Sequence, residues 1–157
     1  MYRRQTRADR ERDDMWISTK GKNAVKVMID LGMYTTGEPV KVKDIARRQD
    51  ISDKYLEQII AMLNKSGLVK SIRGAKGGYV LNDQPDKITV GQILEAAEGD
   101  MSVVDNLGDV TGDNLTDIVC DRFWGKLDES VRQVLDNTTL ADLVEDQQAL
   151  LTDQYMI

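Results

Sequence analysis

Residues 51–81 decide the expected fold, and they read ISDKYLEQIIAMLNKSGLVKSIRGAKGGYVL. The first part of this stretch has apolar side chains at steps of three and four residues, which indicates an amphipathic helix. Ser52 is a suitable N-cap for that helix, and Gly67 is a suitable C-terminal stop. The apolar stripe is expected to consist of Tyr55, Ile59, Met62 and Leu63.

A short hairpin is expected to follow this helix. Its strands are predicted at 68–72 and 79–81, with the turn RGAKGG at 73–78 between them. The three glycines of the turn allow positive φ and let the backbone approach a partner closely. Arg73 and Lys76 place two cations at the tip without a neighbouring acid, which favours an anionic partner. A polar helix followed by a basic hairpin is typical of a winged helix-turn-helix.

Further helices are predicted on both sides of this unit. The pattern Val25, Met28, Ile29 and Met33 indicates a first helix, for which Ser18 is a suitable cap. A short helix is expected at about 43–49, and together with the helix from Ser52 it forms the helix-turn-helix pair. Thr89 and Gln92 have the spacing of a capping box, which predicts another short helix that ends near Gly99.

A long helix is predicted from Leu115, where the helical period of apolar residues returns for about twenty residues. Little of the chain is left to cover its apolar side, so we expect it to pair with the same helix of a second copy. Thr139 and Asp142 then begin a final short helix. The expected dimer interface consists of Leu115, Ile118, Trp124, Leu127, Val131 and Val134.

Charge is distributed unevenly along the chain, although the formal net charge is only −6. Residues 17–81 contain twelve Lys and Arg against six Asp and Glu, whereas residues 82–157 contain four against seventeen. A basic first part and an acidic second part fit a DNA-binding module followed by a module of another kind. Residues 1–14 are polar and of mixed sign, and we expect a solvated extension or, alternatively, an arginine arm for a minor groove.

Composition excludes several classes of protein. No apolar run approaches the roughly 20 residues that span a bilayer, and no signal peptide is visible, so a cytoplasmic protein without a membrane partner is expected. The single cysteine excludes an intramolecular disulfide framework. The chain contains no histidine, which removes the commonest general base and the commonest metal ligand, so an enzyme is not expected. The acids at 105, 109 and 113 favour a solvated loop over a divalent-ion site, because EF-hand spacing is absent.

Five runs of the sequence carry a resemblance to a known family. They are ISTKGKNAV at 17–25, ISDKYLEQII at 51–60, GLVKSIRGAKGGYVL at 67–81, ITVGQILEAAEG at 88–99 and VLDNTTLADL at 134–143. They resemble the bacterial winged-helix transcriptional regulators that include the iron–sulfur cluster regulator and the cysteine-metabolism repressor. The resemblance covers nearly all of the chain from Met15 onward, and its joined motif of YLEQ and RGAKGGY is specific.

The resemblance implies a mostly α fold with a small β wing, divided into four segments. These are a polar N-terminal extension at 1–14, a winged helix-turn-helix domain at 15–98, an effector-type loop at 99–114, and a dimerisation helix with a C-terminal helix at 115–157. The helix from Ser52 would read the major groove and the wing would enter the minor groove. The implied DNA-binding residues are Lys20, Ser52, Lys54, Tyr55, Glu57, Gln58, Arg73, Gly74, Lys76 and Gly77.

Side-chain chemistry agrees with this assignment in part. Glutamate accepts from cytosine N4, glutamine pairs with adenine, and arginine is favoured electrostatically in a narrow minor groove. For Tyr55, packing against the core is the preferred interpretation over base contact. Glu57 has an alternative role as a surface ion-pair partner.

The sequence departs from the cluster-binding members of this family at the cofactor ligands. Those members carry three cysteines before the long helix, whereas residues 99–119 contain none. We therefore expect no cofactor and a place closer to the cysteine-metabolism branch, whose partner is a cysteine synthase-type protein. The lone Cys120 has two interpretations, namely a small buried apolar residue or a redox-sensing thiol, and the acids at 117 and 121 disfavour a reactive thiolate.

The expected function is that of a dimeric, sequence-specific repressor of sulfur, cysteine or iron–sulfur related genes, which binds double-stranded DNA at a palindromic operator. One alternative is a redox or iron–sulfur sensing regulator that uses Cys120. An alternative of another class is a protein-interaction module that acts through the acidic second half.

Overall fold

The computed structural model describes residues 17–34, 37–104 and 114–156. The predicted extension at 1–14 and most of the predicted loop at 99–114 lie outside these residues. The described elements are α2 (Thr19–Tyr34), α3 (Val42–Gln49), α4 (Asp53–Lys65), β1 (Val69–Ile72), β2 (Gly78–Leu81), the 3-10 helix η1 (Pro85–Lys87), α5 (Val90–Glu98), α6 (Leu115–Asn137) and α7 (Leu140–Tyr155). The predicted mostly α fold with a small wing is confirmed.

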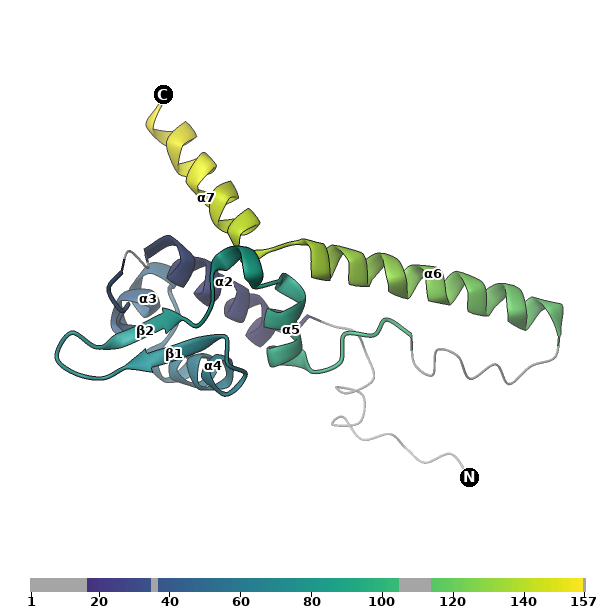
Figure 1. Cartoon of the computed structure of the whole chain (residues 1–157), viewed down its shortest axis with the longest axis horizontal. Helices are drawn as coiled ribbons and strands as arrows, with labels where there is room; N and C mark the ends of the chain where they lie inside the picture. Colours follow the sequence, from purple (N-terminus) through teal and green to yellow (C-terminus); the bar gives the residue numbers. More distant parts are fainter. Residues whose placement is uncertain (1–16, 35–36, 105–113, 157) are drawn as a thin grey trace.

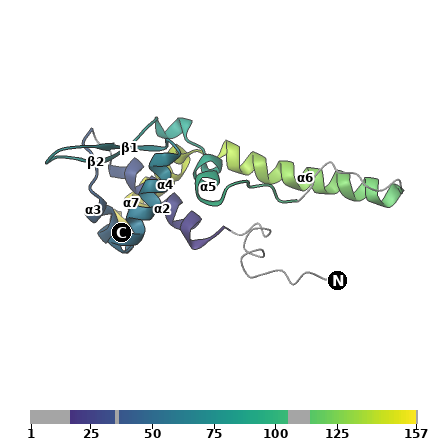
Figure 2. The same ribbon diagram turned by 90° about the horizontal axis from the view of Figure 1, so that it is seen from below.

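Helices α2 to α5 and the wing form one body, from which α6 and α7 leave in different directions (Figure 1). Seen from below, the wing extends from the side of the body opposite to α6 (Figure 2). Helix α7 is longer than the short helix predicted from the sequence, because apolar residues continue at helical spacing as far as Tyr155.

The core lies where α2 meets α3, α4, α5 and the first turn of α7. The predicted stripe of α4 is correct at Ile59 and Leu63 but incomplete, because Leu56 and Ile60 are also fully buried. Tyr55 and Met62 are only half-buried at its edge. Neighbours lie on several sides of α4, so a wider arc of the helix is buried than one stripe would cover. Residues inside this body include Met28, Leu31, Ile45, Ile93 and Leu140.

A buried ion pair fixes α3 on α2. Arg48 donates from Nη2 to Oδ1 of Asp30 at 2.7 Å and from Nε to Oδ2 at 3.0 Å. Gln49 donates to the same carboxylate at 2.8 Å, and the Arg48 guanidinium lies 4.0 Å from the ring centre of Tyr34. The hydrogen bonds to Asp30 raise the pKa of Arg48. The helix that precedes α4 therefore has a defined orientation, which a two-helix DNA reader requires.

The wing is an antiparallel hairpin in which Val69 pairs with Leu81 and Ile72 pairs with Gly78. Only Gly74 among the three turn glycines has a positive φ, of 115°. A side chain at Gly78 would collide with the Val40 carbonyl, so this glycine serves the close approach of two backbones. Val40 and Tyr79 exchange two backbone hydrogen bonds of 2.9 and 2.8 Å, which attach the hairpin to the segment before α3.

Candidate DNA-binding surface

The exposed face of α4 is polar, and it begins at a capped N-terminus. The Tyr55 amide donates to Ser52 Oγ at 3.3 Å, as predicted for an N-cap. Lys54, Glu57 and Gln58 are exposed on the side of α4 away from the core. Tyr55 is half-buried against the core, in agreement with its preferred interpretation. The helix can therefore present a cation, an acceptor and an amide to a ligand without losing core contacts.

The tip of the wing is an exposed basic turn. Arg73, Gly74 and Lys76 are exposed, whereas Gly77 is half-buried, because its backbone lies close to the carbonyl groups of Ile72 and Gly74. Within the ranges 17–34, 37–104 and 114–156, neither Arg73 nor Lys76 forms an ion pair. Cations without internal partners are available to neutralise the phosphates of a nucleic acid.

Three further cations extend this basic surface, and sequence reasoning had not assigned them a role. Lys41, Lys43 and Arg47 are exposed at or on α3. Among the described residues Arg47 pairs with Asp44 of its own helix, at 3.5 Å, and 78% of its side chain is exposed. In helix-turn-helix proteins the first helix crosses the DNA backbone. The four-residue spacing of 43 and 47, off the apolar face, was the available signal.

Lys20 is exposed in the first turn of α2. The start of α2 is tied to the end of α5, because Ser18 donates its amide to Glu98 at 2.9 Å. Both ribbon views place this end of α2 away from the tip of the wing (Figures 1 and 2). Lys20 therefore lies apart from the basic tip of the wing, and its role in DNA binding stays a prediction.

Helix α6 begins at the predicted residue and extends far beyond the body (Figure 1). The interface side chains predicted on it are open in the single chain: Leu115, Trp124 and Val134 are exposed, and Ile118, Leu127 and Val131 are half-buried. Two apolar residues absent from that set are also exposed, Val119 and Phe123. The rings of Phe123 and Trp124 meet edge to face at 5.1 Å. We call these eight side chains the α6 stripe.

Cys120 is exposed on α6 in the single chain. No other described element covers this part of α6, so burial of Cys120 depends on the predicted pairing with a second copy and stays a prediction.

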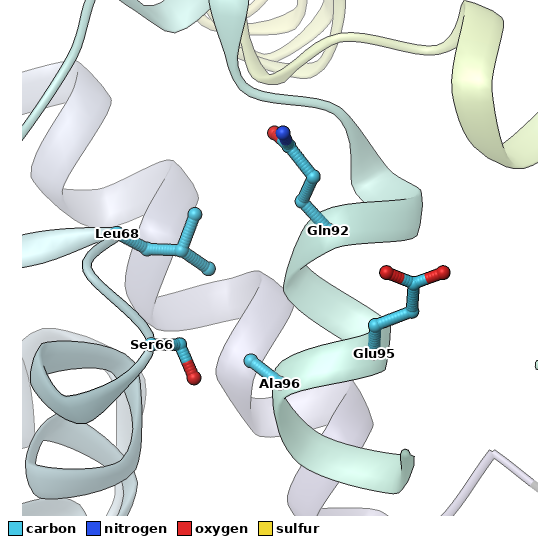
Figure 3. A pocket seen from close by; sticks show the side chains of 5 residues that line it. All are labelled: Ser66, Leu68, Gln92, Glu95 and Ala96. Carbon is cyan, nitrogen blue, oxygen red and sulfur yellow. The ribbon is translucent and has the colours of Figure 1, made fainter. Parts of the chain in front are cut away.

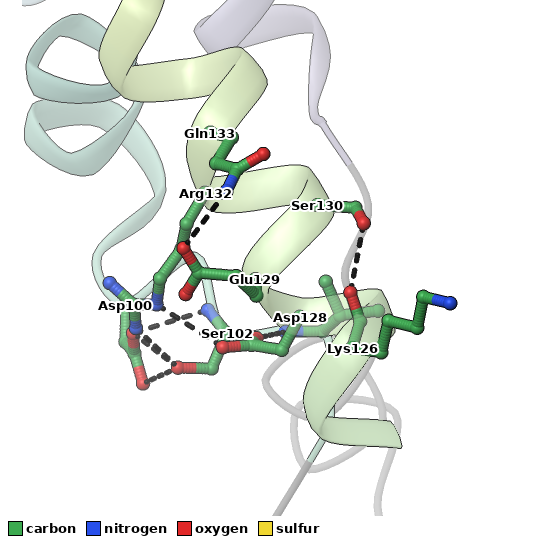
Figure 4. Close-up of polar contacts among 9 residues, drawn as sticks. Asp100, Ser102, Lys126, Asp128, Glu129, Ser130, Arg132 and Gln133 are labelled. Atoms are coloured by element: carbon green, nitrogen blue, oxygen red, sulfur yellow. Dashed lines mark hydrogen bonds and ion pairs between the residues drawn. The ribbon is translucent and has the colours of Figure 1, made fainter. Parts of the chain in front are cut away.

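A polar network joins the start of the 99–114 segment to α6 (Figure 4). The Val103 amide donates to Asp128 at 2.9 Å, and Arg132 donates to Asp128 at 3.2 Å and to the Ser102 hydroxyl at 3.2 Å. Ser102 in turn donates to Asp100. The hydrogen bond from Val103, with Arg132 as a further cause, lowers the pKa of Asp128. Asp128 is thus a buried carboxylate whose charge holds this segment in place.

A shallow pocket of about 330 Å³ lies between the end of α4 and α5 (Figure 3). Its polar lining is largely committed to helix ends, because Gln92 accepts from the Thr89 amide at 3.0 Å and Ser66 donates to Met62 at 3.1 Å. We assign no ligand to it.

The described helices include none that is long and apolar enough to cross a membrane.

Comparison with known proteins agrees with this geometry. The model of the Rrf2 family, described as an iron-dependent transcriptional regulator, matches residues 17–146. The chain belongs to the Rrf2 family. It is 43% identical over 129 residues to the HTH-type transcriptional regulator CymR of Bacillus subtilis, covering 82% of this chain and 89% of that protein.

Solved structures of Rrf2-like regulators have the same fold. The structure of CymR, the global cysteine regulator of B. subtilis, superposes with a TM-score of 0.73 at 42% identity, covering 83% of this chain and 96% of that one. The IscR structure from T. potens superposes with a TM-score of 0.67 at 42% identity, covering 84% and 88%. The predicted family is confirmed, and the protein is a DNA-binding transcriptional regulator and not an enzyme.

The iron in the description of the Rrf2 family does not fit the ligands that this chain offers. A cluster is normally held by four ligands, most of them thiolates, whereas the chain has one cysteine and no histidine. In the described part of the chain no three of the residue types His, Cys, Asp and Glu come together as a metal site would require.

Proposed function

We propose that this Rrf2 protein is a homodimeric repressor that binds a palindromic operator without a cofactor. The observation that carries the proposal is an open polar face on α4 beside wing cations that pair with no described residue. In addition, no described element covers the α6 stripe. In this arrangement α4 lies in the major groove and the wing lies against the minor groove.

Each exposed group has a role that its chemistry suits. Gln58 offers a bidentate amide for adenine, Glu57 accepts from cytosine, and Arg73 enters a narrow minor groove. Lys54 and Lys76 neutralise phosphates and fix the register, as do the cations of α3. Ser52 holds the N-terminus of α4, Gly74 shapes the tip, and Tyr55 supports the helix from the core side.

The dimer follows from the α6 stripe. Leu115 is 80% exposed and Val134 is 67% exposed, and monomeric soluble proteins rarely leave such a large apolar area open. Pairing with a second copy around a two-fold axis covers the stripe and places two α4 helices on successive major grooves, about 34–36 Å apart. The operator is therefore a palindrome, and the bound dimer excludes other proteins from that DNA.

The regulated genes belong to sulfur, cysteine or iron–sulfur metabolism, and the partner is a cysteine synthase-type protein. This part rests on the similarity to regulators named for cysteine and to IscR. The single cysteine favours the cofactor-free form of such a regulator.

The test is selection of bound sequences from random duplex DNA, followed by gel-shift titration of the best site. The expected result is a two-fold symmetric site, with half-sites about one helical turn apart, to which Gln58→Ala binds more weakly and less specifically. Lys87→Ala, a change of an exposed cation beyond the wing, is the control. An asymmetric site, or equal losses for both variants, would contradict the proposal.

A second candidate is a thiol-responsive regulator, which the exposure of Cys120 favours. Oxidation at this position would alter the α6 stripe and hence the dimer. Operator binding by Cys120→Ser that still responds to peroxide would eliminate this candidate.

A further inference from the structure

The end of α7 carries apolar side chains that no described part of the chain covers. Leu150 is 65% exposed, Tyr155 86% and Met156 81%. The match to the Rrf2 family ends at residue 146, so this part of α7 lies beyond the region that the family shares. In Figure 1 it rises from the side of the body opposite to α4, which leaves the DNA-binding surface clear of it.

Leu150 and Tyr155 continue a stripe that is buried nearer the body, whereas Met156, the C-cap, lies off it. Leu140 is fully buried and Val144 nearly so, and Val144 lies against Gly32 of α2, where any side chain would collide with it. The stripe then repeats after seven residues, from Leu143 to Leu150 and from Val144 to Leu151. A seven-residue repeat is the pattern by which one helix packs along another. The first repeat meets α2, and the second has no partner among the described residues.

The charges on α7 leave the stripe itself free of carboxylates. No Lys or Arg occurs from Leu140 to Ile157. At 100° per residue the acids at 142, 145, 146 and 153 fall on the side of α7 away from the stripe. The stripe itself contains the neutral Gln147 and Gln154, again seven residues apart. Two such stripes can meet without bringing carboxylates together, and facing glutamines can hydrogen-bond across a two-fold axis.

We propose that residues 147–156 pair with the same segment of a second copy, around a two-fold axis distinct from that of α6. Because α6 and α7 leave the body in different directions, this contact joins one α6 dimer to another. The segment is short and buries less than the roughly 1,200 Å² of a stable interface, so a single pair is weak. A dimer has two such segments, and simultaneous engagement of both strengthens the assembly.

Sedimentation velocity of the full chain over a wide concentration range tests the proposal. The expected result is a reversible rise in mass from dimer toward tetramer. The double variant Leu151→Gln with Tyr155→Gln should lose this step and remain a dimer that binds a single operator as the wild type does. Asp146→Asn, an exposed change on the acidic side of the same helix, should retain the step.

The proposal is overturned by a wild type that stays a dimer at every concentration, and equally by a double variant that associates like the wild type. Far-ultraviolet circular dichroism establishes that the variant is folded. The expected step from dimer to tetramer rests on the α6 dimer of the proposed function. The α6 contact and the α7 contact can nevertheless be tested separately. Dissociation to monomers on changing the α6 stripe reports on α6, whereas loss of the higher step on changing α7 reports on α7. A double variant that becomes monomeric would place α7 in the α6 interface and refute a separate contact.

Discussion

Replacing Asp30 and replacing Arg48, the two partners of a buried ion pair, should destabilise the protein to different extents. Removing one partner of a buried, hydrogen-bonded pair costs about 3–5 kcal/mol. The side chain of Asp30 is fully buried, whereas 25% of the Arg48 side chain is exposed. After Asp30→Asn, water can hydrate the Arg48 guanidinium. We therefore expect the free energy of unfolding to fall by about 3 kcal/mol, near the lower end of this range.

Arg48→Met should cost more, because it leaves a buried carboxylate with one remaining donor, Gln49. We expect about 5 kcal/mol for this change. Replacing both partners with apolar residues, as Asp30→Leu with Arg48→Met, removes the unpaired charge and should recover part of that loss. With Asp30→Leu as the matching single variant, the double-mutant cycle should give a coupling energy of about 2–3 kcal/mol.

The assay is guanidinium unfolding followed by circular dichroism at one fixed protein concentration, since a dimer's stability depends on concentration. Arg47→Met is the matched control, because Arg47 lies on the same helix with 78% of its side chain exposed and only Asp44 nearby. Its cost should stay within about 0.5 kcal/mol. If Arg48→Met were no more destabilising than Arg47→Met, the reasoning about the buried pair would be refuted.

Three other predictions concern DNA, the dimer and pH. Arg73→Ala should weaken operator binding by about 1–3 kcal/mol in a gel-shift titration at fixed salt, and unchanged affinity would remove Arg73 from the interface. Leu127→Asp with Val131→Asp should dissociate the dimer in sedimentation, because each buried charge costs several kcal/mol, and a persistent dimer would show that the interface lies elsewhere. The lowered pKa of Asp128 means that its contribution is complete above about pH 4, the ordinary carboxyl range, and is lost as pH falls through the folded-state value. Thermal melts of Asp128→Asn should therefore decline less steeply in acid than those of the wild type, and parallel declines would contradict this assignment.

The sequence predicted those parts of the fold that depend on local signals. The caps at Ser52 and Thr89, the positive φ of Gly74 and the start of α6 at Leu115 are each determined by a few neighbouring residues. Such signals can be read from the sequence because the residues that form them lie three or four positions apart. The polar face of α4 followed from the same local periodicity.

Long-range contacts were the part that the sequence could not provide. Nothing near Asp30 indicates that it receives Arg48 and Gln49, which lie 18 and 19 residues away. Asp128 accepts from Val103 across 25 residues, and neither residue belongs to a recognisable motif. Burial of Cys120 could not be decided from the sequence for the same reason, because burial on a long helix depends on whether another element covers it. The residues on α3 were overlooked because a cation on a short helix has many possible uses.

The attachment of the wing to the segment before α3 has a consequence for operator choice. Val40 and Tyr79 are bonded to one another, and Gly78 lies directly against the Val40 carbonyl, so the hairpin has little freedom to tilt. Because the hairpin cannot tilt to fit, its contact with the DNA depends on the width of the minor groove beneath it. Narrow minor grooves occur over A-tracts, which are stiff. Among operators with the same base contacts to α4, affinity should therefore rise with the A·T content of the base-pair steps under the wing. Loss of the Val40–Tyr79 hydrogen bonds should reduce these differences in affinity.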